Sequence, residues 1–207
     1  MTAHRSFSIY LAAAMTALVP GLVFAHDGAS LPYGSFLGGL THPVLGLDHF
    51  LAMVSVGIVS VQIGGRAIWT VPATFVVIMA LGGLLGYINV GLSAIETGIA
   101  ASVLVLGGAI AMDKKVPVVF AMCAVAIFAV FHGYAHGAEM PAVANPYTYV
   151  AGFMTGTIIL HLMGVVVGDI SQHYEKGKLL LRIAGAAIAG TGAVSYTHLT
   201  LPTIYSV

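Results

Sequence analysis

The stretch HPVLGLDHFLAMVSVGI, from His42 to Ile58, decides how the chain is interpreted. It begins with a histidine-proline pair and places Asp48 and His49 inside a run that is otherwise apolar and glycine-containing. Ionisable side chains at membrane depth are energetically costly and usually mark a functional site. We therefore interpret this stretch as a membrane segment that carries a site, and we expect the rest of the chain to supply its partners.

The composition indicates a membrane protein. Of the 207 residues, 59% are hydrophobic and 7% are charged, whereas soluble domains carry roughly 25% charged residues. Basic and acidic residues balance at seven each, so no strongly basic face marks a nucleic-acid-binding protein. Cys123 is the single cysteine, which excludes an internal disulfide and a CxxC metal site. The nine histidines are the unusual feature of a chain that otherwise avoids polarity.

Residues 1–25 have the features of a secretory signal peptide, with Arg5 near the start, then an apolar stretch, then small residues. Val23 and Ala25 fit the two small-residue positions of a cleavage site, and cleavage there leaves His26 as the mature N-terminus. The free α-amine and the imidazole of His26 are then a candidate metal chelate. An uncleaved first membrane helix is the alternative.

Six apolar segments follow a short extracytoplasmic lead-in, and each is long enough to cross the hydrocarbon core as a helix. We predict an all-α membrane protein, a six-transmembrane-helix bundle over residues 26–194 that a cleavable signal peptide precedes. The predicted spans are 44–63, 67–88, 95–112, 116–136, 147–168 and 179–195.

Residues 195–207 do not match the alanine- and glycine-rich segment before them, because they are polar and turn-prone. We interpret them as an atypical tail of foreign or frameshifted origin, fused to a truncated last helix. A genuine short extracytoplasmic tail is the alternative. We assign no function to His198 in this tail.

The positive charges predict the orientation in the membrane. Every second connection contains or borders basic residues, whereas 89–94 and 137–146 hold none. Because Lys and Arg concentrate in cytoplasmic loops, we predict a multi-pass protein of the bacterial cytoplasmic (inner) membrane with its mature N-terminus in the periplasm. The basic residues of the mature chain are Arg66, Lys114, Lys115, Lys176, Lys178 and Arg182.

Glycine pairs four residues apart recur along the chain. Such pairs let membrane helices approach closely, although a glycine-rich composition also produces them by chance. The pairs are Gly82 with Gly86, Gly133 with Gly137, Gly152 with Gly156, and Gly164 with Gly168.

The first ionisable group in the membrane is that of His42, Asp48 and His49. Positions seven apart lie within about 20° on a continuous helix, so His42 and His49 would share one face about 10 Å apart. Pro43 suits the first helical turn, where its missing N–H does no harm. Asp48 points elsewhere and either orients a histidine of another helix or acts as a ligand itself.

The second group is FHGYAHGAE, in which His132, His136 and Glu139 fall on one helical face. Two imidazoles at i and i+4 are a standard way to offer two nitrogens to one divalent metal. The third group is Thr157 with His161, about 14 residues and roughly 20 Å from the outer end of their helix. His161 is therefore expected deeper in the membrane.

The predicted topology places the first two groups in the outer half of the bundle. Imidazoles with carboxylates suit Ni²⁺, Co²⁺, Zn²⁺ or Cu²⁺ and do not suit Mg²⁺ or Ca²⁺, which prefer oxygen ligands. Two alternatives remain open. The histidines can serve only as interhelical hydrogen-bonding residues, or they can form a proton relay.

Together, HPVLGLDHFLAMVSVGI, FHGYAHGAE and GFMTGTIILHLMG resemble the HupE/UreJ family of bacterial nickel permeases, over roughly residues 26–194. The resemblance implies uptake of nickel, or of cobalt in some members, for [NiFe]-hydrogenase and urease. The tail after Val194 departs from the family's last helix. The resemblance implies a set of candidate metal-path residues: His42, Asp48, His49, His132, His136 and Glu139. His161 matches the family's pattern less closely than these residues do.

We therefore predict a secondary transporter that moves Ni²⁺ or Co²⁺ from periplasm to cytoplasm, with no permanently bound cofactor. Its partners are the transported ion, the lipid bilayer and metalloenzyme maturation proteins. A membrane accessory protein that delivers nickel to a partner and a proton-relay protein are the alternatives. An enzyme is not expected, because HGYAH lacks the glutamate of the metalloprotease motif HExxH.

Overall fold

The computed structural model describes residue 31 and residues 33–200, and this part of the chain contains helices but no strands. The predicted signal peptide and His26 lie outside the described residues, as do residues 201–207. The helices are α2 (Gly34–Leu45), α3 (Leu47–Ile63), α4 (Ala67–Tyr87), α5 (Ile95–Met112), α6 (Val118–Ala138), α7 (Pro146–Gln172) and α8 (Glu175–Thr200).

Most of the described helices are suited to a membrane. The five helices α4 to α8 are each long and apolar enough to cross one, and the bent pair of α2 and α3 is a sixth candidate if it counts as one span. Large apolar side chains such as Trp69, Phe120 and Val166 remain exposed on helix surfaces, as expected of surfaces that face lipid. The prediction of an all-helical, multi-pass protein is therefore confirmed, with five or six spans.

The first predicted span is broken at Gly46. Its backbone is extended, with φ −85° and ψ 112°, and α3 lies at 82° to α2. Residues 34–41, interpreted as a lead-in, belong to α2, and Pro43 lies in its last turn rather than a first turn. The expectation that His42 and His49 share one face of a continuous helix is therefore wrong. Glycine is a poor helix former, which favours a break at this position.

α6 packs along α4 through glycines. A Cβ atom added to Gly133 would collide with the backbone carbonyl of Met79, and one added to Gly137 would collide with that of Gly83. On α4, Gly86 is equally close to the carbonyl of Tyr134. The two backbones are in contact, so these glycines pack helices, as small residues do in membrane bundles.

α7 uses glycines in the same way on two neighbours. A Cβ on Gly152 would meet the carbonyl of Phe36 on α2, and a Cβ on Gly164 would meet the carbonyl of Val54 on α3. The packing interpretation of the glycine pairs is thereby confirmed. α7 holds α2 and α3 in place on either side of their bend.

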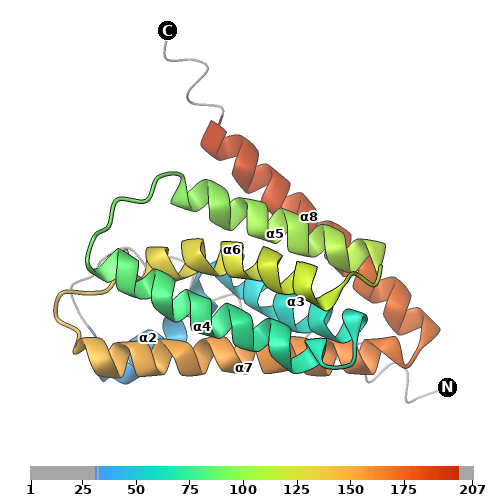
Figure 1. The fold of residues 1–207 in the computed structure, drawn as a ribbon, viewed down its shortest axis with the longest axis horizontal. Helices are drawn as coiled ribbons and strands as arrows, with labels where there is room; N and C mark the ends of the chain where they lie inside the picture. Colours follow the sequence, from blue (N-terminus) through green and yellow to red (C-terminus); the bar gives the residue numbers. More distant parts are fainter. Residues whose placement is uncertain (1–30, 32, 201–207) are drawn as a thin grey trace, which may run out of the picture. The chain divides into compact units, whose positions relative to one another are not determined.

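Two ends of the bundle differ in charge. The α3–α4, α5–α6 and α7–α8 connections lie at one end, on the right in Figure 1, and the α4–α5 and α6–α7 connections lie at the other. Gln172 donates to Asp113 over 3.3 Å and so joins two of the connections at the first end. We call this the basic end and the opposite one the histidine end. The Lys and Arg residues of the described range, all at the basic end, are Arg66, Lys114, Lys115, Lys176, Lys178 and Arg182.

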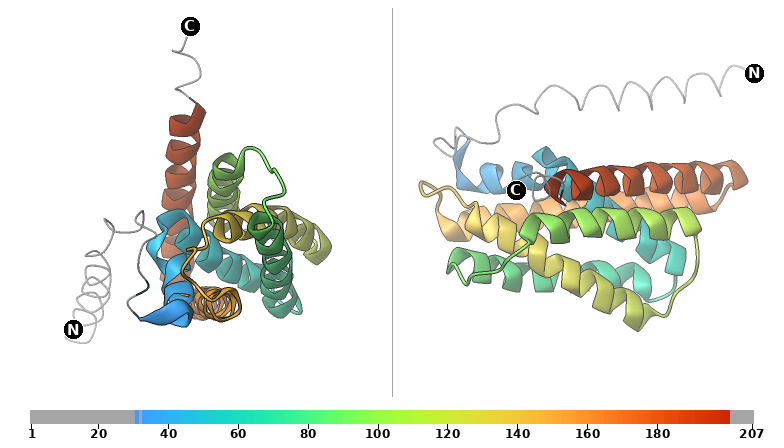
Figure 2. Two further views of the ribbon diagram at one scale, coloured as in Figure 1. Left: turned by 90° about the vertical axis from the view of Figure 1, so that its left-hand side faces the viewer. Right: turned by 90° about the horizontal axis from the view of Figure 1, so that it is seen from above.

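α8 lies along α5, as Figures 1 and 2 show. Gly107 and Gly185 bring these two backbones into contact. α8 continues to Thr200, five residues beyond the predicted end of the last span. The foreign origin proposed for residues 195–207 stays a prediction.

α3 lies at the centre of the bundle, where it contacts α2, α4, α5, α6 and α7. Its side chains Met53 and Val56 are fully buried and form one core with Phe75 and Met79 of α4. His49 lies one turn before Met53 on this central helix. The position of α3 therefore places His49 inside the bundle.

Candidate metal site

The bend between α2 and α3 brings histidines of both helices to α6. The ring centroid of His42 on α2 is 4.8 Å from that of His136 on α6. The ring of His49 on α3 is 4.3 Å from His136 and 4.7 Å from His132. Four imidazoles from three helices thus form one contiguous row. The prediction that His132 and His136 share a face is confirmed, because both contact His49.

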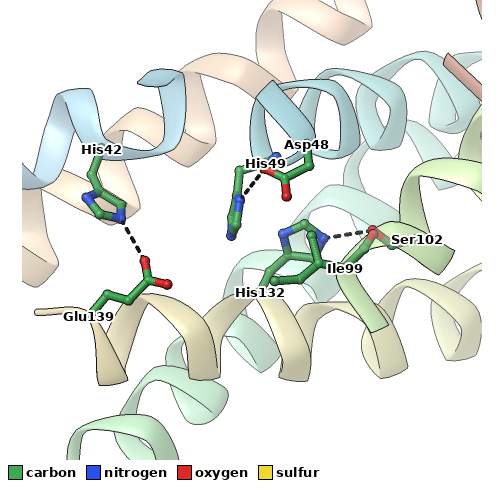
Figure 3. A network of polar contacts seen from close by, with 7 residues as sticks. All are labelled: His42, Asp48, His49, Ile99, Ser102, His132 and Glu139. Atoms are coloured by element: carbon green, nitrogen blue, oxygen red, sulfur yellow. Dashed lines mark hydrogen bonds and ion pairs between the residues drawn. The ribbon is translucent and has the colours of Figure 1, made fainter. Parts of the chain in front are cut away.

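Glu139 and His42 form the rim of this row. Glu139 directly follows α6, its side chain is 63% exposed, and its Oε2 lies 3.6 Å from Nε2 of the half-buried His42, as Figure 3 shows. This polar contact with His42 lowers the pKa of the Glu139 carboxyl, which therefore stays ionised at neutral pH. An ionised carboxylate at the entrance attracts cations.

His42, His136 and Glu139 together can hold a metal ion. One ligand atom from each residue lies within 4.8 Å of the others. Two bonds of about 2.1 Å, typical of imidazole nitrogen on a transition metal, place their ligand atoms about 3.0 to 3.4 Å apart at octahedral or tetrahedral angles. Binding one ion therefore requires the three ligand atoms to close by up to about 1.8 Å. The Glu139 side chain is 63% exposed and can supply part of this movement by rotation.

His136 connects the rim to the interior. It is 4% exposed, and neither of its ring nitrogens has a hydrogen-bond partner among the described residues. Phe153 packs on the ring, with centroids 4.2 Å apart. Buried polar atoms are almost always paired. The His136 ring contacts both His42 and His49, and a neutral ring offers its lone pair to a metal on one of the two free nitrogens at a time.

Asp48 orients its own neighbour. Its Oδ1 accepts hydrogen bonds from the backbone N–H of His49 over 2.8 Å and from Nδ1 of the same residue over 2.9 Å (Figure 3). The expectation that Asp48 orients a histidine of another helix is wrong, because the bend at Gly46 starts a new helix immediately before it. With Nδ1 bonded to a carboxylate, the lone pair of His49 lies on Nε2, which is buried and without a partner in the described range.

His132 is the innermost member of the row. It is fully buried, and its Nε2 lies 2.8 Å from Oγ of Ser102 on α5. Its Nδ1 has no partner within residues 33–200. The ring of Phe75 lies 5.7 Å away on the inner side.

His161 lies deeper and is separated from the row. Its Nδ1 is 2.7 Å from the carbonyl oxygen of Met53, a group that only accepts, so Nδ1 donates and Nε2 carries the lone pair. That Nε2 is buried and unpaired within the described part of the chain. Phe75 contacts both His161, at 5.1 Å, and His132. One apolar ring therefore contacts both the row and the deeper histidine.

A cavity of about 450 Å³ adjoins the row between α4, α6 and α7. Of the residues that line it, only His136 carries an imidazole, and the others are mostly apolar, among them Met79, Phe153 and Met154. The cavity leaves room for the His136 ring to change its orientation.

Three contributors were not foreseen from the sequence. Ser102 lies in an apolar segment without any motif, and Phe75 looks like any other core aromatic residue. The carbonyl of Met53 belongs to the backbone, which no side-chain pattern reveals. A polar residue in an apolar span is a weak signal for Ser102, and nothing comparable marks Phe75.

Comparison with known proteins assigns the family. The family model described as HupE / UreJ protein matches residues 13–195. This chain belongs to the HupE/UreJ family. Protein HupE of Rhizobium leguminosarum bv. viciae is 43% identical to it over 175 residues, which cover 84% of this chain and 90% of that protein. No solved structure matches the chain. The resemblance noted in the sequence is confirmed, and the match ends at the first residue of the atypical tail.

Proposed function

We propose that this chain is a secondary transporter that admits Ni²⁺, or Co²⁺, from the periplasm to the cytoplasm. The observation that carries the proposal is the set of five buried ring nitrogens that have no partner among the described residues. They belong to His49, His132, His136 and His161. Buried imidazoles that serve only to pack helices satisfy both nitrogens as far as they can. Unprotonated ring nitrogens are the ligands that borderline metals prefer.

The ion enters at the rim. The ionised Glu139 attracts the hydrated cation, and His42 with His136 then replaces part of its water shell. The ligand set of two imidazoles and one carboxylate favours Ni²⁺ or Co²⁺ over Mg²⁺ and Ca²⁺. The ion is cargo, so no cofactor stays bound.

His136 then passes the ion inward. Its ring contacts both His42 and His49, and a change of tautomer moves its single lone pair from one nitrogen to the other, so one ring can serve two neighbouring binding positions in turn. His49 and His132 form the next position. Few ligands at each position keep binding weak enough for release, as conduction through several sites requires.

Passage beyond His132 needs a conformational change. Phe75 is fully buried and contacts both His132 and His161, so its ring has to move before an ion can reach the deeper histidine. His161 with its free Nε2 is the next ligand on the inner side. The rest of the route leads toward the basic end.

The charge distribution supports the direction of transport. Lys and Arg concentrate in cytoplasmic connections, so the basic end faces the cytoplasm and the histidine end faces the periplasm of the bacterial inner membrane. The family membership agrees with a role in nickel handling, with maturation proteins of metalloenzymes as the receiving partners. The proposal excludes a catalytic role for the histidines.

Uptake of radioactive nickel into proteoliposomes of the purified chain tests the proposal. We expect uptake that Co²⁺ suppresses and Mg²⁺ does not, and that His132→Ala abolishes. His173→Ala is the matched control, since this exposed histidine lies at the basic end. Tight nickel binding without uptake would favour the accessory protein. Proton flux without metal uptake would favour the proton relay.

A further inference from the structure

Among the described residues, Ser102 supplies the hydroxyl that lies within hydrogen-bond distance of the histidine row. It lies on α5, is fully buried, and makes two short contacts. Its Oγ is 2.6 Å from the carbonyl oxygen of Ile99 and 2.8 Å from Nε2 of His132, as Figure 3 shows. The hydroxyl has a single proton, so it can donate in only one of these two contacts.

The position of that proton follows from the donors available. Two oxygens 2.6 Å apart need a hydrogen between them, and the carbonyl of Ile99 has none to give. The Ser102 hydroxyl therefore donates to Ile99, a common i to i−3 hydrogen bond of serine in a helix. Its oxygen remains as an acceptor, so the contact with His132 must be a donation from the histidine.

This assignment fixes the tautomer of His132. Nε2 carries the proton, so the lone pair of the neutral ring lies on Nδ1. That atom is buried, has no partner in the described range, and lies on the side of the ring that faces His49 (Figure 3). The two rings are 4.7 Å apart and nearly perpendicular, at 84°. The free lone pairs of His132 and His49 therefore belong to neighbouring rings of one row.

The tautomers of His49 and His161 are also fixed by a hydrogen-bond partner. In both cases the partner can only accept: the carboxylate of Asp48 for His49 and the backbone carbonyl of Met53 for His161. His132 differs, because a hydroxyl can donate or accept. Its tautomer depends on the second bond of Ser102 to Ile99. Loss of a residue that hydrogen-bonds to a metal ligand typically lowers metal affinity by about 10- to 100-fold.

We propose that Ser102 is a positioning residue that holds His132 with Nε2 protonated, so that His132 binds the transported metal through Nδ1. The metal-binding part of this inference rests on the proposed function, whereas the tautomer does not.

The test is the ¹⁵N spectrum of histidine side chains in the metal-free, detergent-solubilised full chain, since protonated and unprotonated ring nitrogens have separate shifts. His132→Asn identifies the His132 signals by their loss. In the parent we expect a protonated Nε2 and an unprotonated Nδ1. Ser102→Ala should move His132 toward the other tautomer and weaken Ni²⁺ binding about tenfold, and Ser102→Thr, which keeps the hydroxyl, should restore both.

Ser60→Ala is the matched control. Ser60 is fully buried and donates to the carbonyl of Gly57 over 2.7 Å with the same i to i−3 geometry, but no histidine of the described residues hydrogen-bonds to it. It should change neither the His132 spectrum nor the nickel affinity. A parent spectrum with Nδ1 protonated, or a His132 spectrum that Ser102→Ala leaves unchanged, would overturn the inference. A tautomer that shifts as expected in a chain that neither binds nor transports nickel would support Ser102 and refute the transporter.

Discussion

α6 presents two faces of opposite character from neighbouring residues. Gly133 and Gly137 lie against the backbone of α4, where an added Cβ has no room. His132 and His136, one position earlier in each case, face α3 and the row of imidazoles. On the first face the two backbones are in direct contact. On the second face, three ring nitrogens of His132 and His136 have no hydrogen-bond partner among the described residues.

The difference shows how a membrane helix can be held firmly by one neighbour and still present side chains that are available to a ligand. Each residue turns the helix by about 100°, so a glycine pair and a histidine pair offset by one residue serve two neighbours at once. The backbone contact with α4 fixes the position of α6. The histidines then do not have to hold the helix and remain available to a ligand. Four changes test this division, from the largest expected effect to the smallest.

His136→Gln should have the largest effect on transport. The change keeps the size of the side chain but removes the ring that contacts both His42 and His49. We expect nickel uptake to fall by about 100-fold, at least as much as the loss of a ligand's supporting partner costs. Uptake assays at matched protein levels measure this, with His173→Gln as the control. Normal uptake in His136→Gln would mean that the ring only packs the bundle.

Gly137→Leu should have the largest effect on stability. The new side chain has to displace the backbone of α4 at Gly83, and such overpacking costs about 3 kcal/mol or more. Gly190→Leu is the matched control, because nothing lies within 4 Å of a Cβ there. Thermal unfolding in detergent should show a lower transition for the first variant only. Equal transitions would show that the close face of α6 adapts without cost.

Glu139→Gln should weaken uptake at low metal concentration about three- to fivefold, because an exposed charge contributes up to about 1 kcal/mol. Glu96→Gln is the control, since Glu96 is another exposed carboxylate at the histidine end, in the first turn of α5. The difference should shrink at high ionic strength, where salt screens the attraction. An equal loss in both variants would indicate a general surface-charge effect rather than a role of the rim.

Gly46→Ala should have the smallest effect. The backbone angles at Gly46 are open to alanine, but the new Cβ would lie 3.2 Å from Nδ1 of His49 and 3.4 Å from Oδ1 of Asp48. A shift of a few tenths of an ångström relieves this crowding, so we expect nickel affinity to fall about twofold. Isothermal titration measures it. A loss of affinity as large as that of His136→Gln would mean that the bend itself controls the site.

Much of the fold could be predicted from the sequence because it depends on local patterns. Apolar length determined the spans, and α5 begins and ends where it was predicted. Spacing by four predicted both faces of α6. The broken first span was missed, because a lone Gly46 in a glycine-rich chain carries no distinctive signal. Asp48 was assigned the wrong partner for the same reason.

The sequence by itself determined that this is a helical membrane protein of one family, with imidazoles inside the bundle, carboxylates next to them in the sequence, and basic residues at alternate connections. These properties follow from composition and from the 3.6-residue period, which act within one segment. Only the tertiary structure decided that His42 meets His136 and that Phe75 contacts both His132 and His161. It also decided that Ser102 on α5 supports His132 on α6. Such contacts join residues far apart in the chain, and they depend on the bend at Gly46 and on how closely the backbones pack.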